Sequence, residues 1–212
     1  MKTTKLLTAL LALAALVGCA TETPQATDYA AKVNPKIGSG GHGHVFVGAN
    51  VPFGMTQVGP TSITQEWDWC SGYHDSENSV IGFSHTHLSG TGCGDLFDVT
   101  LMPVMGEVVY SRGRLGDYST GFWSEADRTQ EVVEPGYYSV PLTRYDILAE
   151  MTATERGALH RYTFPEGEDA AIILDLVHGG CFDRPEELYA EAVSDTRVVG
   201  RRHSWGWSNN QK

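Results

Sequence analysis

The chain has 212 residues, of which 41% are hydrophobic and 19% charged, with 24 glycines and 9 prolines. These proportions exclude a disordered tail, a coiled coil and a collagen-like fibre, and the length is sufficient to bury a core. Lys and Arg total 15 against 26 Asp and Glu, which gives a formal net charge of −11. Because such an acidic surface repels phosphates, we expect no nucleic-acid partner.

The first residues predict an export signal rather than a part of the fold. Two lysines precede the apolar run 6–17, which is too short to span a bilayer as a permanent helix. The run ends in Leu16–Cys19, which resembles the bacterial lipoprotein box, where cleavage falls before the cysteine and the cysteine then carries lipid. We therefore expect a signal peptide over 1–18, lipid on Cys19 and a polar tether over 19–31. An ordinary signal peptide cut nearby is the alternative.

Lipidation and export together predict where the protein resides. A processed signal of this kind places it in the periplasm or on the outer membrane of a Gram-negative bacterium, with the membrane as a partner through the lipid anchor. That compartment permits disulfides. Three cysteines remain after residue 19, which is an odd number, so at least one of them is outside any intramolecular pair. They are Cys70, Cys93 and Cys181.

The body of the chain predicts antiparallel β-structure. Apolar and polar side chains alternate over 147–153, which is the period of a half-buried strand, and 155–157 resembles a turn. Pro135-Gly136 suits the centre of a type II turn. In chain order, strands are predicted at 97–105, 131–134, 137–140, 147–153, 158–164, 170–176, 187–193 and 196–202. Many short strands with few amphipathic helices indicate an all-β fold, an antiparallel β-sandwich.

The C-terminal end of the sequence predicts an unfinished sheet. The last predicted strand is followed by Trp205, Trp207 and the polar stub 208–212. Two tryptophans so near the end need cover that little remaining chain can provide, and a sheet stopped there exposes an edge and apolar surface. We therefore expect the sandwich to be incomplete at its C-terminal end. A short exposed tail with locally packed tryptophans is the alternative.

Residues with chemical potential gather between positions 34 and 98. The glycine-rich run 38–44 lacks the Gly-Lys-Ser/Thr ending of a phosphate loop, so its glycines suit a tight turn or close approach to a ligand. The segment 66–74 interleaves three aromatic rings with a carboxylate, a thiol and an imidazole. That mixture suits a sugar, whose C–H faces stack on rings while its hydroxyls need hydrogen-bond partners. A tryptophan-rich corner of the core explains the composition equally well.

Histidine spacing raises the question of a metal site. Two pairs are spaced i, i+2, which places both imidazoles on one face of a strand, as many metal sites require: His42 with His44, and His85 with His87. Four residues could add ligands: Cys70, Cys93, Asp95 and Asp98. However, no Cys-x-x-Cys occurs, and no Glu follows His44 at the spacing of cupin-type sites. We therefore expect structural histidines and no zinc or iron site.

A set of longer segments carries a family resemblance. They are Val33–Gly38, Gly40–His44, Val51–Met55, Trp67–His74, Ile81–Asp95, Pro135–Val140, Thr152–Arg156 and His160–Pro165. In this order they resemble the N-terminal domain of glycoside hydrolase family 92, which comprises exo-acting α-mannosidases. The resemblance runs from about Val33 to Trp207. It implies that 32–212 form that domain, a supersandwich-like β-sandwich.

The resemblance also implies an activity. It implies a two-domain enzyme in which a larger (α/α)₆ barrel follows the sandwich. Such enzymes hydrolyse terminal α-mannosides with inversion and need calcium. Inversion requires an acid and a base far enough apart to admit a water. In the family both carboxylates and most of the calcium environment come from the barrel. We therefore expect no catalytic residue in this chain and no calcium held by it alone, with mannose-containing glycans and the barrel as partners.

Matching motifs imply which residues contribute to the sugar pocket. Those expected to bind the sugar are Gly41, His42, His44, Trp67, Asp68, Trp69 and Cys70. Trp67 or Trp69 would offer a stacking face, and Asp68 would accept hydrogen bonds from hydroxyls. Those expected to support the loops are Tyr73, His85 and His87. Packing at a domain interface is the alternative role for each.

Two other functions remain open at this point. The chain could be a free-standing carbohydrate-binding lipoprotein without catalytic activity, or an unrelated metal-binding sandwich. Continuation of the coding region past Lys212 distinguishes the first of these from an enzyme, and metal analysis tests the second.

Overall fold

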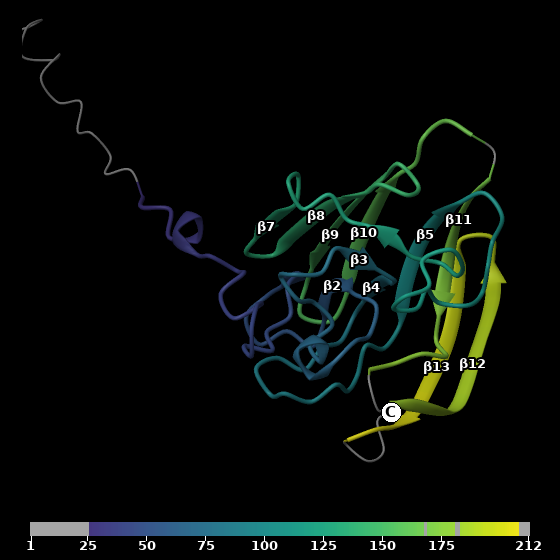
Figure 1. Cartoon of the computed structure of the whole chain (residues 1–212), viewed down its shortest axis with the longest axis horizontal. Coiled ribbons are helices and arrows are strands. Elements are labelled where there is room, and N and C mark those ends of the chain that lie inside the picture. The colour runs from purple at the N-terminus through teal and green to yellow at the C-terminus, as the bar shows by residue number, and fades with distance from the viewer. Residues whose placement is uncertain (1–25, 168, 181–182, 208–212) are drawn as a thin grey trace, which may run out of the picture.

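A computed structural model describes residues 26–167, 169–180 and 183–207, and strands dominate it (Figure 1). One antiparallel sheet has the order β1-β2-β4-β5-β11. Its strands are β1 (Ala49–Asn50), β2 (Gln57–Thr61), β4 (Gly82–Ser84), β5 (Thr100–Met105) and β11 (Ala170–Asp175). The second has the order β10-β9-β8-β7. Its strands are β7 (Val132–Glu134), β8 (Tyr137–Leu142), β9 (Ile147–Ala153) and β10 (Ala158–Thr163). The predicted all-β class is confirmed.

The second sheet is a meander of hairpins, as the alternation predicts. β7 and β8 are joined by Pro135-Gly136, and Gly136 has the positive φ of 79° that a type II turn requires. β9 and β10 close through the turn at 154–157, where the Thr154 amide donates to the Gly157 carbonyl at 2.8 Å. Side chains on β9 alternate in direction, so Ile147, Ala149 and Met151 all lie in the core.

The core lies between the two sheets, which makes the fold a sandwich. β9 of one sheet contacts β1 and β2 of the other. The first sheet contributes Phe83, Met102 and Val104, all at most 2% exposed, and the second contributes Tyr138 and Val140, both fully buried. Large apolar side chains from both inner faces therefore interdigitate, and their burial supplies the main driving force of the fold.

The C-terminal strands form a separate long hairpin, β12 (Arg184–Ser194) and β13 (Arg197–Trp205), at the right-hand end of Figure 1. Among the described strands, they pair only with each other. Several of their apolar side chains are exposed, namely Leu188, Tyr189, Val193, Val198 and Trp205. Arg202 connects the hairpin to the preceding part of the chain. Its side chain forms ion pairs with Asp98 and Asp183 and donates a hydrogen bond to the Leu176 carbonyl at 2.9 Å. A further small ribbon consists of β3 (Ser79–Val80) and β6 (Ser124–Glu125).

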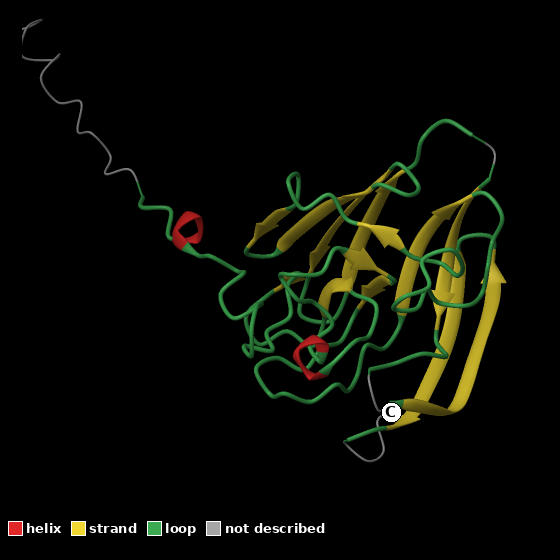
Figure 2. Ribbon diagram, in the orientation of Figure 1, coloured by secondary structure: helices red, strands yellow, loops and turns green. Residues whose placement is uncertain are grey.

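The described N-terminal residues run away from the sandwich. Residues 26–34 are exposed, and the short 3₁₀ turn η1 (Ala30–Lys32) stands clear of the strands (Figure 2). The predicted signal peptide, Cys19 and the first part of the tether lie outside the described residues. Within residues 26–167, 169–180 and 183–207, no helix is long and apolar enough to cross a membrane.

Candidate functional site

Three loops meet around the second 3₁₀ turn, η2 (Trp67–Trp69), which lies among loops below the strands in Figure 2. They are residues 38–44, 66–72 and 85–96. The Gly90 amide donates to the His44 carbonyl at 2.6 Å, which joins the third loop to the first. The Trp67 indole N–H donates to the Gly92 carbonyl at 2.8 Å, which joins the third loop to the second. The fold therefore gathers residues that are far apart in sequence.

Asp68 lies at the centre of this group. Its Oδ1 accepts hydrogen bonds from His42 Nδ1 at 2.7 Å and from His44 Nε2 at 3.1 Å. The His42 side chain is 79% exposed and that of Asp68 23%, whereas that of His44 is almost covered at 6%. The hydrogen bond from His42 is the largest cause of a lowered Asp68 pKa. Asp68 is therefore a carboxylate at neutral pH, and solvent reaches it from the His42 side.

Trp67 supplies an exposed aromatic surface beside that carboxylate. It is 59% exposed. One side of the indole meets the His44 ring edge-on, with centroids 4.2 Å apart at 61°. Gly92, which has a φ of 67°, lets the third loop approach closely, since a Cβ there would lie 2.9 Å from the indole. The ring is thus held in place with part of its surface free.

The segment from Cys70 to His74 is buried, and Trp69 is half-buried. Trp69 stacks on His74 with centroids 4.4 Å apart, and His74 Nε2 lies 3.3 Å from the Gly41 carbonyl of the glycine loop. Cys70 is 2% exposed and Tyr73 only 1%, and the Tyr73 hydroxyl donates to Glu131 at 3.2 Å. Trp67, rather than Trp69, therefore offers the free ring face. Cys70 and Tyr73 are buried and Trp69 is covered on one face by His74, so none of the three matches the exposure of Trp67.

Gly41 marks the tip of the first loop. It has a φ of 55°, and a Cβ built on it would meet nothing within 4 Å. Its neighbour Gly43 is tightly confined, because a Cβ there would lie 2.1 Å from the Gly38 carbonyl oxygen. The glycines thus give the loop a sharp return that places the two histidines on the same side, toward Asp68.

The second histidine pair is divided between two positions. His87 is 3% exposed and stacks on Phe46, with ring centroids 5.0 Å apart. Its ring also lies close to Gly72, near η2, because a Cβ on Gly72 would be 3.3 Å from it. Its Nδ1 donates to the Gln57 carbonyl at 2.8 Å. His85 faces the other sheet instead, with its Nε2 3.0 Å from that of His160 on β10. His87 therefore supports the η2 loop, whereas His85 connects the two sheets.

Sequence reasoning missed a buried ionic group that anchors the first loop. The Glu131 side chain is fully buried. It forms ion pairs with Lys36 and Arg128 and accepts hydrogen bonds from the hydroxyls of Tyr73 and Tyr138. Burial alone raises the pKa of Glu131, but the charge of Arg128 and the hydrogen bonds from Lys36 and Tyr138 bring it below its ordinary value. Lys36 precedes the glycine loop, so this group fixes where the loop starts. The only signal in the sequence was a basic residue inside a long motif.

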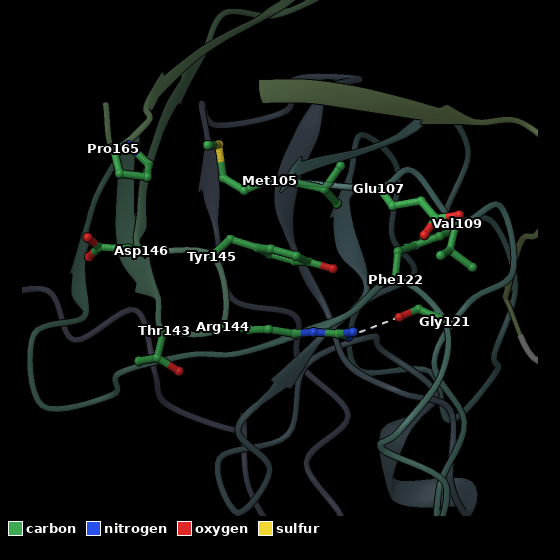
Figure 3. Close-up of a pocket in the computed structure, with 11 residues that line it drawn as sticks. Met105, Glu107, Val109, Gly121, Phe122, Thr143, Arg144, Tyr145, Asp146 and Pro165 are labelled. Carbon is green, nitrogen blue, oxygen red and sulfur yellow. Dashed lines mark hydrogen bonds between the residues drawn. The ribbon is translucent and has the colours of Figure 1, made fainter. Parts of the chain in front are cut away.

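A separate cavity of about 460 Å³ involves different residues (Figure 3). Arg144 and Tyr145 extend across it, toward Phe122 and Gly121. The Arg144 guanidinium donates to the carbonyls of Gly121 at 2.9 Å and Trp123 at 3.1 Å. Its Nη1 is therefore used within the fold, and none of the expected sugar-site residues lines this cavity.

Within the described residues, one group of histidine, cysteine and acidic side chains is close enough to share a metal ion. It consists of His42, His44 and Asp68, whose ligand atoms all lie within 4.8 Å of one another. Calcium takes six to eight oxygen ligands, so two nitrogens and one carboxylate oxygen do not fit it. The other suggested ligands are not in the group, namely Cys70, Cys93, Asp95, Asp98, His85 and His87.

Comparison with known proteins gives consistent matches. The model of the glycosyl hydrolase family 92 N-terminal domain matches residues 32–212. The chain is similar to the family GH92 α-mannosidase BT3965 from Bacteroides thetaiotaomicron, solved in complex with mannoimidazole, with a TM-score of 0.81 and 35% identity. That match covers 85% of this chain and 24% of the mannosidase.

Two further matches agree. The GH92 family glycosyl hydrolase ccman5 has a TM-score of 0.71 and 26% identity over 85% of this chain and 25% of its own. An uncharacterized secreted glycosidase from Arthroderma benhamiae is 31% identical over 159 residues, or 68% of this chain and 19% of that protein. The chain therefore spans about a quarter or less of the length of these relatives.

Proposed function

We propose a function from one premise: the chain belongs to the glycosyl hydrolase family 92 N-terminal domain family. Its loops 38–44 and 66–70 form one wall of a pocket for terminal α-mannosides. The chain thereby acts as the N-terminal part of a calcium-dependent, inverting exo-α-mannosidase that degrades glycans. The second wall belongs to the larger barrel domain that the family resemblance implies.

The observation that carries this proposal is the exposed Trp67 ring beside the Asp68 carboxylate. A pyranose presents an apolar C–H face, which packs on an indole, and hydroxyls, which need acceptors at the edge of that ring. Asp68 is held in one orientation by His42 and His44, so it accepts from a hydroxyl without first being ordered. A similar protein was solved with mannoimidazole, which supports a ligand of the mannose class.

We place the general acid, the general base and the calcium ion in the implied barrel. A general acid needs a raised pKa, and that of Asp68 is lowered. The nitrogen-rich ligand set around Asp68 does not suit calcium. The role of Asp68 is therefore to bind and orient the sugar.

Export completes the proposal. One similar protein is described as a secreted glycosidase. A signal peptide over 1–18 and lipid on Cys19, followed by the tether 19–31, would hold the enzyme at a bacterial membrane surface facing external glycans. The exposure of residues 26–31 is compatible with a tether.

Trp67→Ala tests the proposed wall. Methyl α-mannoside should perturb the NMR signals of the Trp67 and His42 side chains in the purified chain. Removing the ring should weaken this binding about five-fold, because a lost stacking contact costs on the order of 1 kcal/mol. Tyr110→Ala is the matched control, since Tyr110 is an exposed aromatic residue outside the three loops. Equal mannoside binding by both variants, with folding verified, would refute the proposal.

A further inference from the structure

The arrangement of His42, His44 and Asp68 has a property that neither a sugar site nor a hydrogen-bonded turn requires. Two imidazole nitrogens from one loop converge on a single carboxylate oxygen from another, at 2.7 and 3.1 Å. A tetrahedral zinc ion with bonds of about 2.0–2.1 Å separates neighbouring ligand atoms by roughly 3.3 Å. Small side-chain movements would therefore turn the hydrogen-bonded group into a coordination site.

The surroundings favour a site that is both held and accessible. His44 has a φ of 55°, a left-handed backbone conformation that is uncommon for a residue with a side chain. The Gly90 amide donates a hydrogen bond to the His44 carbonyl. The Trp67 ring packs against the His44 imidazole. His42 is exposed, so an ion can enter from solvent and keep water in its remaining positions. Three protein ligands with open positions are typical of accessible zinc sites.

We propose that His42 Nδ1, His44 Nε2 and Asp68 Oδ1 bind a divalent transition-metal ion of the zinc class. Two imidazoles and one carboxylate are the ligand types that such ions prefer, and calcium needs more oxygens. This proposal departs from the expectation of purely structural histidines for this pair, because i, i+2 spacing could not show that Asp68 lies near both of them. The acidic chain, with a net charge of −11, also attracts cations.

A second consequence rests on the proposed function. The ion would occupy Asp68 and His42, which are polar contacts of the mannoside wall. Zinc and mannoside therefore compete for the same atoms, and micromolar zinc should weaken mannoside binding by this chain.

Zinc titration of the untagged, metal-free chain by calorimetry tests the site. We expect one bound zinc ion per chain, and at least about ten-fold weaker binding in His42→Ala and in Asp68→Asn. His42 is largely exposed, so its removal should leave the fold intact. His178→Gln is the matched control, because His178 also pairs with a carboxylate, that of Asp175, but has no second imidazole in its group. This variant should bind zinc like the parent.

Spectroscopy separates coordination from nonspecific binding. Cobalt in place of zinc should give visible absorption bands of a low-coordinate site, and these bands should disappear in His42→Ala and Asp68→Asn. Zinc affinity unchanged in both variants, or no binding at millimolar zinc, would overturn the proposal. Mannoside binding is measured separately in chelator: its absence there refutes the sugar wall and leaves the zinc result standing, whereas mannoside binding unaffected by zinc refutes only the competition.

Discussion

At the scale of single residues, the contact between His85 and His160 is a hydrogen-bond chain with one consistent direction. The Val99 carbonyl can only accept, so His85 donates from Nδ1 and its Nε2 is an acceptor. His160 then donates from Nε2 at 3.0 Å and accepts from the Tyr162 hydroxyl at its Nδ1 at 2.8 Å. A proton added to His85 would place two N–H groups face to face. In this arrangement both imidazoles are neutral.

Burial of these histidines predicts acid sensitivity. Burial lowers the pKa of His160 and of His87 to about 4, and it also lowers that of His85. An unfolded histidine binds its proton near pH 6.5, so below that pH the unfolded chain takes up more protons than the folded one. Stability is therefore complete above about pH 6.5 and is lost as pH falls toward 4. The loss should be on the order of 3 kcal/mol each for His87 and His160, and His85 adds to it in the same direction.

Urea unfolding at a series of pH values measures this loss. His160→Gln removes one of the titrating groups, and its unfolding free energy should depend less steeply on pH between 6.5 and 4 than that of the parent. His87 and His85 remain in the variant, so a shallower slope persists. An identical slope in parent and variant would contradict the assignment.

At the scale of elements, the glycine loop 38–44 illustrates how backbone shape presents a site. Gly43 lies against the Gly38 carbonyl, where no Cβ fits, while Gly41 faces open space with a φ of 55°. The first position is constrained by contact and the second only by backbone conformation. The two glycines therefore separate the effect of loop shape from that of local strain.

Gly43→Ala should disrupt the site, and Gly41→Ala should largely preserve it. A Cβ 2.1 Å from the Gly38 carbonyl oxygen forces the backbone apart, at a cost of about 2 kcal/mol, and moves both loop histidines away from Asp68. The strain of Ala at Gly41 costs about 1 kcal/mol without a clash. Thermal unfolding and zinc titration of both variants check this. Equal loss of zinc binding in the two would show that contact at Gly43 is not decisive.

At the scale of the whole molecule, the described chain presents the proposed sugar wall and a hairpin with exposed apolar side chains. Val198 is 57% exposed and Tyr189 49%, and Arg202 on β13 forms ion pairs with Asp98 and Asp183. The chain spans 24% of a similar α-mannosidase. Under the proposed function, the sugar wall is completed by a part of the enzyme that lies outside these 212 residues.

We predict that the 212-residue chain by itself releases no mannose from aryl α-mannosides or α-mannobiose, with or without added calcium. Inverting hydrolysis needs a protonated general acid and a separate general base, far enough apart to admit a water. Asp68 does not meet the first requirement, because it is an ionised carboxylate that accepts hydrogen bonds from two imidazoles. Sugar binding without a positioned acid gives no acceleration. Calcium-dependent mannose release that survives a check for contaminating enzymes would place acid and base within this chain.

The sequence by itself determined the family and the longer strands from β5 onward, because alternation, turn glycines and long motifs are local properties of the chain. It did not predict the short strands β1, β2, β3, β4 and β6. It predicted the β7–β8 and β9–β10 hairpins, whose strands are neighbours in sequence. It also showed that the residue types of 66–74 suit sugar binding. Only the tertiary structure decided that Trp67 rather than Trp69 exposes its ring, that Asp68 lies between His42 and His44, and that His85 pairs with His160. These contacts join residues 24 to 75 positions apart. Spacing along one strand or loop carries no information about them, since sheet packing and loop closure bring the partners together.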